Sequence, residues 1–370
     1  MKIVADDRIP FLRGVFEPFA EVVYRPGAAI VPADAADADA LIVRTRTRCD
    51  AALLGASRVR CVATATIGFD HIDVPALTAR GIAWSNAPGC NAESVKNYIV
   101  SALLASGTDP RGRTLGVIGV GQVGRRVAAA GAALGMRVLL NDPPRAEREG
   151  SAQFTELADL LANSDVVTLH VPLERGGRHP TVRLADETFF HRMKRGAWWF
   201  NSCRGEAVDP AAFLAARREG RIAFALMDVW PGEPDLAPEL LAAVEIATAH
   251  IAGYSVDGKA NGTAAAVRFV AGRLGIAELT GFAVRDLPPP VYPPEIVIPP
   301  GTDAVAAVRA AVLHAYDVRR DAAALRRAPG EFEQLRGTYW KRREFSAYTV
   351  SGAPPDAADT LRKLGFQVRN

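Results

Sequence analysis

The chain has 370 residues, 49% hydrophobic and 23% charged, as is typical of a soluble globular protein with two or three domains. Its net charge of +3 is too small to indicate a nucleic-acid or membrane partner. Cys49, Cys61, Cys90 and Cys203 form no C-x-x-C pair, so we expect free thiols and no metal site. Because the N-terminus lacks an apolar signal core, we expect a cytoplasmic protein.

Two blocks of alternating strand and helix patterns make up the first 285 residues. In the first block, apolar segments at 2–6, 39–45, 60–66 and 82–86 predict a parallel sheet that is covered on both faces. The second block opens with a helix pattern at 91–105 and continues with strand patterns at 114–119, 137–142, 165–171, 197–202, 222–229 and 244–250. This alternation predicts two doubly wound α/β domains, which bind ligands outside the carboxyl ends of their strands.

The composition changes past residue 285. Residues 287–300 contain seven prolines, which predicts an extended linker or an edge segment. Residues 302–328 have helical spacing, with Thr302 or Asp303 as the cap. Strand, helix and strand patterns follow at 345–352, 354–365 and 366–370. We therefore expect a small third α/β domain.

A glycine loop indicates a dinucleotide site. Gly119, Gly121 and Gly124 have the G-x-G-x-x-G spacing between a predicted strand and a predicted helix. The first allows a tight turn, the second lets the backbone approach a pyrophosphate, and the third lets helix and strand pack closely. Asp142, 18 residues beyond Gly124, would bind ribose hydroxyls and favour NAD over NADP. A methyltransferase can present similar features, but it leaves the polar residues at later strand ends unexplained.

Those polar residues follow three successive predicted strands: Arg204, then Asp228 and Glu233, then His250. Because parallel strands end at one edge of a sheet, we expect the side chains to meet. Histidine can take a proton from a hydroxyl, a carboxylate can orient its ring, and arginine can bind a carboxylate. Each residue alone has a structural explanation: Arg204 in a surface ion pair, Glu233 in a turn and His250 in the core. Together with the glycine loop, they predict hydride transfer at a 2-hydroxy acid.

Three arginines, Arg44, Arg46 and Arg48, lie at the end of the pattern at 39–45. Alternation would point them the same way wherever the strand continues. One or more could bind a phosphate; the alternative is a solvated basic edge.

Six motifs resemble those of the D-isomer-specific 2-hydroxyacid dehydrogenases: ATIGFDHID at 65–73, GVIGVGQVG at 116–124, HVPL at 170–173, NSCRG at 201–205, DVWPGEP at 228–234 and HIAG at 250–253. The resemblance spans nearly all of the first 280 residues. Segments at 87–92, 141–146, 250–263 and 316–321, with PGEFEQLR and KRREFS in the third domain, look like the branch that acts on 4-phospho-D-erythronate.

The resemblance implies oxidation of 4-phospho-D-erythronate to 2-oxo-3-hydroxy-4-phosphobutanoate by NAD, in pyridoxine biosynthesis. It implies a homodimer, and a 2-oxo acid that reoxidises the cofactor. The implied catalytic residues are Arg204, Glu233 and His250, with His250 as proton donor and acceptor. The predicted cofactor contacts, which include the glycine-loop residues, are Gly119, Gly121, Gln122, Val123, Gly124, Asp142, Val171, Ser202, Cys203, Arg204, Asp228 and Gly253. The implied substrate contacts are Thr45, Thr66 and Tyr254, with Arg44 and Arg46 as further candidates.

Among the departures from the family pattern, which include the ADDRIP start and Asn97, two concern predicted site residues. Thr45 stands where serine is common and keeps the hydroxyl, whereas Val171 stands where threonine is common and lacks it. We expect a flavodoxin-like substrate-binding domain at 1–90, completed by about 253–285. A Rossmann NAD-binding domain at 91–252 and a C-terminal α/β dimerisation domain at 286–370 complete the expected chain.

Two alternative functions remain open. One is a dehydrogenase for another 2-hydroxy acid, with 3-phosphoglycerate as the substrate or with glyoxylate or hydroxypyruvate as the 2-oxo acid, although the third domain does not resemble a serine-binding regulatory domain. The other is a non-catalytic NAD-sensing protein like the related corepressors, which can retain the Arg/Glu/His set. The sequence shows no recognisable DNA-binding motif, which favours the enzyme.

Overall fold

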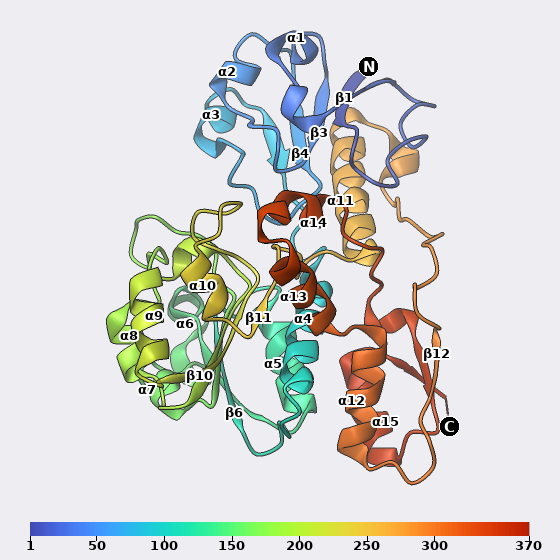
Figure 1. Cartoon of the computed structure of the whole chain (residues 1–370). Coiled ribbons are helices and arrows are strands. Elements are labelled where there is room, and N and C mark those ends of the chain that lie inside the picture. The colour runs from blue at the N-terminus through green and yellow to red at the C-terminus, as the bar shows by residue number, and fades with distance from the viewer. Residues whose placement is uncertain (370) are drawn as a thin grey trace. The chain divides into compact units, whose positions relative to one another are not determined.

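A computed structural model describes residues 1–369, which form two compact units (Figure 1). The first unit contains Met1–Asn91 and Ser255–Pro288, and the second contains Ala92–Tyr254 and the described residues from Pro289 onward. The chain therefore passes between the units three times.

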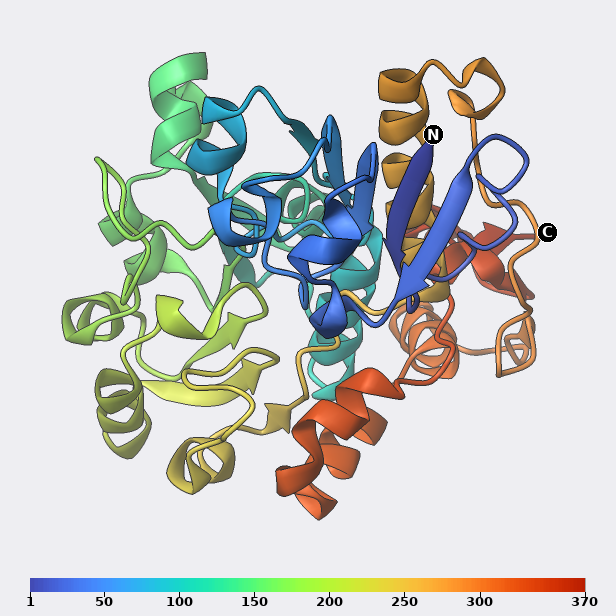
Figure 2. The same ribbon diagram turned by 90° about the horizontal axis from the view of Figure 1, so that it is seen from above.

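The first unit is built on a five-stranded parallel sheet in the order β2-β1-β3-β4-β5. This is the flavodoxin order that we predicted. Figure 2 shows its N-terminal strands side by side, in dark blue near the label N. The strands are β1 (Lys2–Asp6), β2 (Glu21–Arg25), β3 (Ala40–Val43), β4 (Cys61–Thr64) and β5 (Ala83–Ser85). The helices are α1 (Pro32–Ala35), α2 (Ala51–Leu54), α3 (Val74–Ala79) and α11 (Val256–Leu274).

Burial explains which strands of the first unit could be predicted. All residues of β3 and β4 are buried, and apart from Thr64 at the end of β4 they are apolar. The edge strand β2 is half-buried or exposed throughout and carries charges at both ends, so its sequence does not predict a strand.

The second unit contains a six-stranded parallel sheet in the order β11-β10-β9-β8-β6-β7. All six strands were predicted. They are β6 (Thr114–Ile118), β7 (Arg137–Asn141), β8 (Val166–Leu169), β9 (Ala197–Asn201), β10 (Ile222–Met227) and β11 (Ile246–Ala247). The helices are α4 (Ala92–Ala105), α5 (Gly124–Ala133), α6 (Pro143–Glu149), α7 (Leu157–Asn163), α8 (Glu187–Arg192), α9 (Pro210–Arg218) and α10 (Pro238–Ala242).

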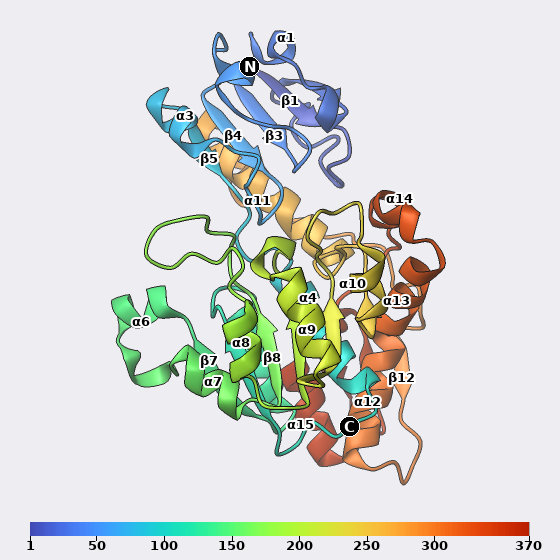
Figure 3. The same ribbon diagram turned by 60° about the vertical axis from the view of Figure 1, so that its left-hand side comes forward.

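Helices cover both faces of this sheet. Helices α7, α8 and α9 lie on one side, in the foreground of Figure 3, and α4 and α5 lie on the other (Figure 1). The strand order reverses at β6, which has β7 on one side and β8 on the other. A ligand of such a sheet binds at this switch point, outside the carboxyl ends of the strands.

The C-terminal segment of the second unit forms a three-stranded parallel sheet in the order β12-β13-β14. Its apolar residues share one core with α4 and α5. Helices α12 and α15 pack beyond those two helices, on the side away from the large sheet (Figure 1). The elements are β12 (Glu295–Val297), α12 (Ala304–Ala315), α13 (Val318–Arg327), α14 (Phe332–Gly337), β13 (Thr349–Ser351), α15 (Pro355–Leu364) and β14 (Gln367–Val368).

The helix predicted over 302–328 is two helices, α12 and α13. Asp303 caps the first, as one of the two expected candidates. The helix breaks at Tyr316, and the Asp317 side chain caps α13. The Ser101 hydroxyl on α4 donates to the Tyr316 carbonyl and accepts from the Val318 N–H, so it satisfies both sides of the break. The sequence gives no sign of this partner 215 residues away.

Candidate active site

The glycine loop joins β6 to α5 with the geometry expected for each glycine. Gly119 has φ +84°, and a Cβ there would lie 2.7 Å from the His170 carbonyl, at the end of β8. A Cβ at Gly124 would lie 1.9 Å from the Gly119 oxygen, so a side chain would push α5 away from the loop. Beside Gly121 the space is open, which leaves its backbone accessible to a pyrophosphate. The loop therefore fits a dinucleotide.

Asp142 directly follows β7, beside this loop, and caps α6. Its Oδ2 accepts from the Val120 N–H at 2.8 Å and its Oδ1 from the Arg145 N–H at 3.1 Å. The Arg145 guanidinium is bound to Glu149 and to the Val120 carbonyl, so its charge is already matched. A ribose hydroxyl can still donate to the carboxylate, whereas a 2′-phosphate would meet its negative charge.

The loop after β9 holds an unpartnered polar atom. Ser202 Oγ is buried and has no hydrogen-bond partner within residues 1–369, which fits a bound polar ligand such as a cofactor. Asn201 braces the loop, because its Oδ1 accepts from the Cys203 N–H and its Nδ2 donates to the Arg204 carbonyl. Burial raises the pKa of the Cys203 thiol, so this cysteine stays protonated at neutral pH.

The loops after β9 and β10 pack directly on each other. A Cβ at Gly205 would lie 2.1 Å from the Trp230 carbonyl, so only glycine allows this approach. Arg204 precedes Gly205, and Glu233 follows Trp230 in the second loop. The contact thus holds the Arg204 and Glu233 segments together.

The loop after β11 brings His250 to Glu233. His250 Nδ1 and Glu233 Oε1 are 2.5 Å apart, and both side chains are about one quarter exposed. Burial raises the pKa of the Glu233 carboxyl, but the bond to His250, the charges of His250 and Arg336 and the Trp230 N–H outweigh it, so the pKa falls below its ordinary value. A carboxylate at Nδ1 leaves His250 Nε2 as the ring nitrogen that can exchange a proton with a substrate.

His250 has φ +54°, an unusual backbone conformation for a non-glycine residue. Its N–H donates to the Asp228 carbonyl at 2.7 Å. The buried Asp228 carboxylate accepts from the Ile251 and Ala252 N–H groups at 2.8 and 2.9 Å, and from the Thr248 hydroxyl at 2.6 Å. Asp228 therefore fixes the turn that carries His250. Direct contact between Asp228 and NAD stays a prediction.

Two residues behind Asp228 were not found from the sequence. The Tyr98 hydroxyl lies 2.7 Å from Thr248 Oγ1. Because Thr248 donates its own proton to Asp228, Tyr98 must be the donor in the bond to Thr248. Both residues are buried, and nothing in their sequence context distinguishes them from other core residues.

Of the remaining predicted residues in the second unit, Val171 lies beside the glycine loop, where its Cγ1 would be 2.9 Å from a Cβ at Gly119. Gln122 and Val123 follow the loop, and Gly253 precedes Tyr254 in the His250 turn. The cofactor contacts of these residues stay predictions.

The substrate residues predicted in the first unit lie at strand ends. The chain turns after Val43, so the three arginines do not continue β3. Arg44 binds the fully buried Asp6 through two hydrogen bonds of 3.1 and 3.2 Å, and Arg48 pairs with Asp50. Thr45 and Arg46 are exposed.

Thr66, the other residue predicted for substrate in this unit, has an engaged hydroxyl. It lies 2.7 Å from Thr64 Oγ1 and donates to the Gly68 carbonyl at 2.9 Å. Contact of these residues with substrate stays a prediction.

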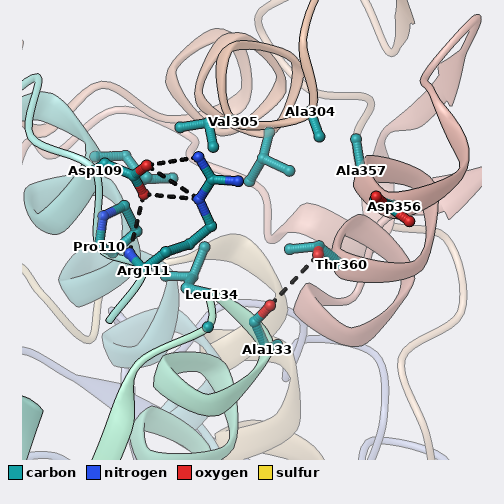
Figure 4. Close-up of a pocket in the computed structure, with 13 residues that line it drawn as sticks. Asp109, Pro110, Arg111, Ala133, Leu134, Ala304, Val305, Asp356, Ala357 and Thr360 are labelled. Atoms are coloured by element: carbon teal, nitrogen blue, oxygen red, sulfur yellow. Dashed lines mark hydrogen bonds and ion pairs between the residues drawn. The ribbon is translucent and has the colours of Figure 1, made fainter. Parts of the chain in front are cut away.

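A cavity of about 250 Å³ lies elsewhere in the second unit, among α4, α5, α12 and α15 (Figure 4). An Arg111–Asp109 ion pair and the Thr360–Ala133 hydrogen bond border it. It adjoins Gly135, just before β7 begins, at the amino ends of the strands, whereas the glycine loop lies at the carboxyl ends. The cavity is therefore separate from the predicted active site.

In residues 1–369, no helix is long and apolar enough to cross a membrane. The same residues contain no group of three or more His, Cys, Asp or Glu side chains placed to hold a metal ion.

Comparison with known proteins identifies two domains. The profile described as D-isomer specific 2-hydroxyacid dehydrogenase, NAD binding domain, matches residues 89–252, so the chain has an NAD-binding domain. A domain of unknown function matches residues 287–365.

Curated relatives match the chain over nearly its full length. Erythronate-4-phosphate dehydrogenase from Bacteroides fragilis is 46% identical over 95% of this chain and 99% of its own length. The protein of that name from Cronobacter sakazakii is 44% identical over 99% and 98%.

Solved structures share the fold. D-lactate dehydrogenase from Aquifex aeolicus, complexed with NAD and lactic acid, is 26% identical with a TM-score of 0.61 and covers 77% of this chain and 99% of its own. The TT0316 protein from Thermus thermophilus is 28% identical with a TM-score of 0.64 over 74% and 97%. The chain belongs to the D-isomer-specific 2-hydroxyacid dehydrogenase family.

Proposed function

We propose that this protein oxidises 4-phospho-D-erythronate to 2-oxo-3-hydroxy-4-phosphobutanoate with NAD, a step in pyridoxal phosphate synthesis. The relatives named erythronate-4-phosphate dehydrogenase support this substrate, because they are 44–46% identical over nearly the whole chain. The observation that carries the chemistry is the 2.5 Å contact between His250 Nδ1 and Glu233 Oε1.

In the proposed mechanism, His250 Nε2 takes the proton of the substrate's C2 hydroxyl. The Glu233 carboxylate keeps the ring in the required orientation and stabilises the imidazolium that forms. Such general base catalysis typically contributes a factor of about 10²–10⁴. When bound, NAD supplies the acceptor for the C2 hydride.

Arg204 is proposed to bind the substrate carboxylate and to polarise the developing C2 carbonyl. Its planar guanidinium can form two parallel hydrogen bonds to a carboxylate. The Asn201 brace and the Gly205–Trp230 contact fix the backbone on either side of Arg204. This rigidity supports a role that depends on position.

A comparative turnover assay tests the proposed substrate. Purified protein would receive 4-phosphoerythronate, 3-phosphoglycerate or glycolate, each with and without a 2-oxo acid that can reoxidise NADH. We expect kcat/KM to be at least about tenfold higher for 4-phosphoerythronate, corresponding to about 1.4 kcal/mol. Preference for 3-phosphoglycerate would contradict the substrate, and unchanged turnover number without the 2-oxo acid would contradict the proposed reoxidant.

We further propose a cytoplasmic homodimer that forms through residues 286–370. Two of the exposed large hydrophobic residues, Val291 and Val297, lie in or next to β12, an edge strand of the small sheet. Exposed apolar edges favour association. Sedimentation of Val297→Lys tests this: we expect a weaker dimer, and an unchanged dissociation constant would contradict an interface at β12.

A further inference from the structure

Arg336 lies on α14, in the segment that matches a domain of unknown function. Its side chain is only 19% exposed. The Nε donates to the Tyr254 hydroxyl at 3.1 Å, and the guanidinium carbon lies 5.9 Å from the Tyr254 ring centre. Arg336 is therefore a mostly buried cation held against an aromatic side chain.

The guanidinium of Arg336 has few hydrogen-bond partners among its neighbours. Glu333 Oε1 lies 3.9 Å from Nη1, and within residues 1–369 Tyr254 is the one hydrogen-bond partner of the guanidinium. By contrast, Arg319 forms two hydrogen bonds of 2.8 and 2.7 Å to the carboxylate of Asp317. A buried guanidinium with unused N–H groups is suited to bind an anion.

The position of Arg336 connects it to the catalytic residues. Tyr254 follows His250 by four residues and leaves the same turn. The charge of Arg336 is also close enough to Glu233 to help lower the pKa of that carboxyl. An anion bound by Arg336 would therefore lie next to the Glu233–His250 pair.

The buried Arg342 fixes the same turn from the same C-terminal segment. Its guanidinium donates to the Ala252 carbonyl at 2.7 Å and to the Ser94 hydroxyl, and stacks 4.2 Å from the Tyr316 ring centre. The C-terminal segment that carries Arg336 is thus anchored to the catalytic turn.

We propose that Arg336, with Tyr254, binds the phosphate group of the substrate and so makes the enzyme specific for a phosphorylated 2-hydroxy acid. The proposal rests on the proposed function. A phosphate monoester carries a charge of about −1.5 to −2 at pH 7, in addition to the carboxylate assigned to Arg204. Glu233 adds a further negative charge, so a second cation is needed nearby. The segment of unknown function would then supply a specificity residue.

Steady-state kinetics with 4-phospho-D-erythronate and with D-erythronate test the assignment. The variants are Arg336→Gln, Arg336→Lys and, as a matched control, Arg319→Gln, which removes a half-exposed arginine of the same segment. For Arg336→Gln we expect kcat/KM to fall about 10- to 100-fold with the phosphorylated substrate, mainly through KM, and less than about threefold with D-erythronate. Arg336→Lys keeps the charge but not the planar fork, so an intermediate loss is expected.

The outcomes separate the two proposals. Equal losses with both substrates would show a structural role and overturn the assignment, as would a preference for the phosphorylated substrate that survives in Arg336→Gln. If the wild-type enzyme did not prefer the phosphorylated substrate, the proposed function itself would fail. Should Arg336→Gln not fold, the Lys variant decides, because a loss confined to the phosphorylated substrate still identifies phosphate recognition.

Discussion

We predict that the buried carboxylate of Asp228 stabilises the turn that carries His250. Its two oxygens accept three hydrogen bonds, from Thr248, Ile251 and Ala252. Asp228→Asn preserves the shape but replaces one oxygen with an NH₂ donor. In the best orientation, the amide keeps the bonds to Thr248 and Ile251, and its NH₂ group faces the Ala252 N–H.

The expected loss of stability follows from the hydrogen bonds that Asp228→Asn loses. One hydrogen bond to a charged acceptor is lost, worth about 1.5–3 kcal/mol, and a buried N–H is left without an acceptor, which costs about 1–3 kcal/mol. Because the two effects overlap, we expect the free energy of unfolding to fall by about 2–4 kcal/mol. We also expect kcat to fall about 10- to 100-fold, since small displacements of catalytic groups have effects of this size.

Urea denaturation and steady-state turnover of Asp228→Asn check this prediction. Asp235→Asn is the matched control, because Asp235 lies in the same loop but is exposed. An unfolding free energy for Asp228→Asn within about 0.5 kcal/mol of wild type would refute the claim that this carboxylate holds the turn.

Two further predictions concern carboxylates. The pKa of Glu233 is below its ordinary 4.5, so its ionised form stabilises the fold above that pH and this contribution disappears as the pH falls through the lower folded value. The stability difference between wild type and Glu233→Gln, from urea titrations between pH 7 and 3, should therefore shrink below about pH 4.5; a difference that grew on acidification would contradict the assigned shift. For Asp142→Ala, we expect titrations to show NAD binding weakened about 10- to 100-fold and selectivity against NADP reduced. Unchanged selectivity would mean that Asp142 does not face the adenosine ribose.

The sequence predicts those parts of the structure that depend on local sequence patterns. Strands β3 and β4 are buried on both faces and are mainly apolar, and close backbone contacts require glycine at Gly119 and Gly124. The half-exposed strand β2 lacks such a signal. Arg204, Glu233 and His250 could be chosen because each follows a predicted strand of a parallel sheet.

The rest depends on contacts between distant segments. Arg342 and Asp321 are charged residues in an arginine-rich sequence, yet Arg342 is buried and Asp321 is half-buried, where it accepts from the Tyr316 and Tyr339 hydroxyls. Nothing in their local pattern distinguishes them from exposed charges. The contact of Arg336 with Tyr254 spans 82 residues and was not visible for the same reason.

Proton transfer by His250 is the central claim, and the turnover number of His250→Asn tests it most directly. Asparagine tolerates the positive φ of +54° and can still donate to Glu233, but it cannot take up a proton near neutral pH. We predict that kcat with 4-phosphoerythronate falls by a factor of about 10²–10⁴, while NAD binding and the unfolding free energy stay close to wild type. A folded, NAD-binding His250→Asn variant with a wild-type kcat would contradict the account.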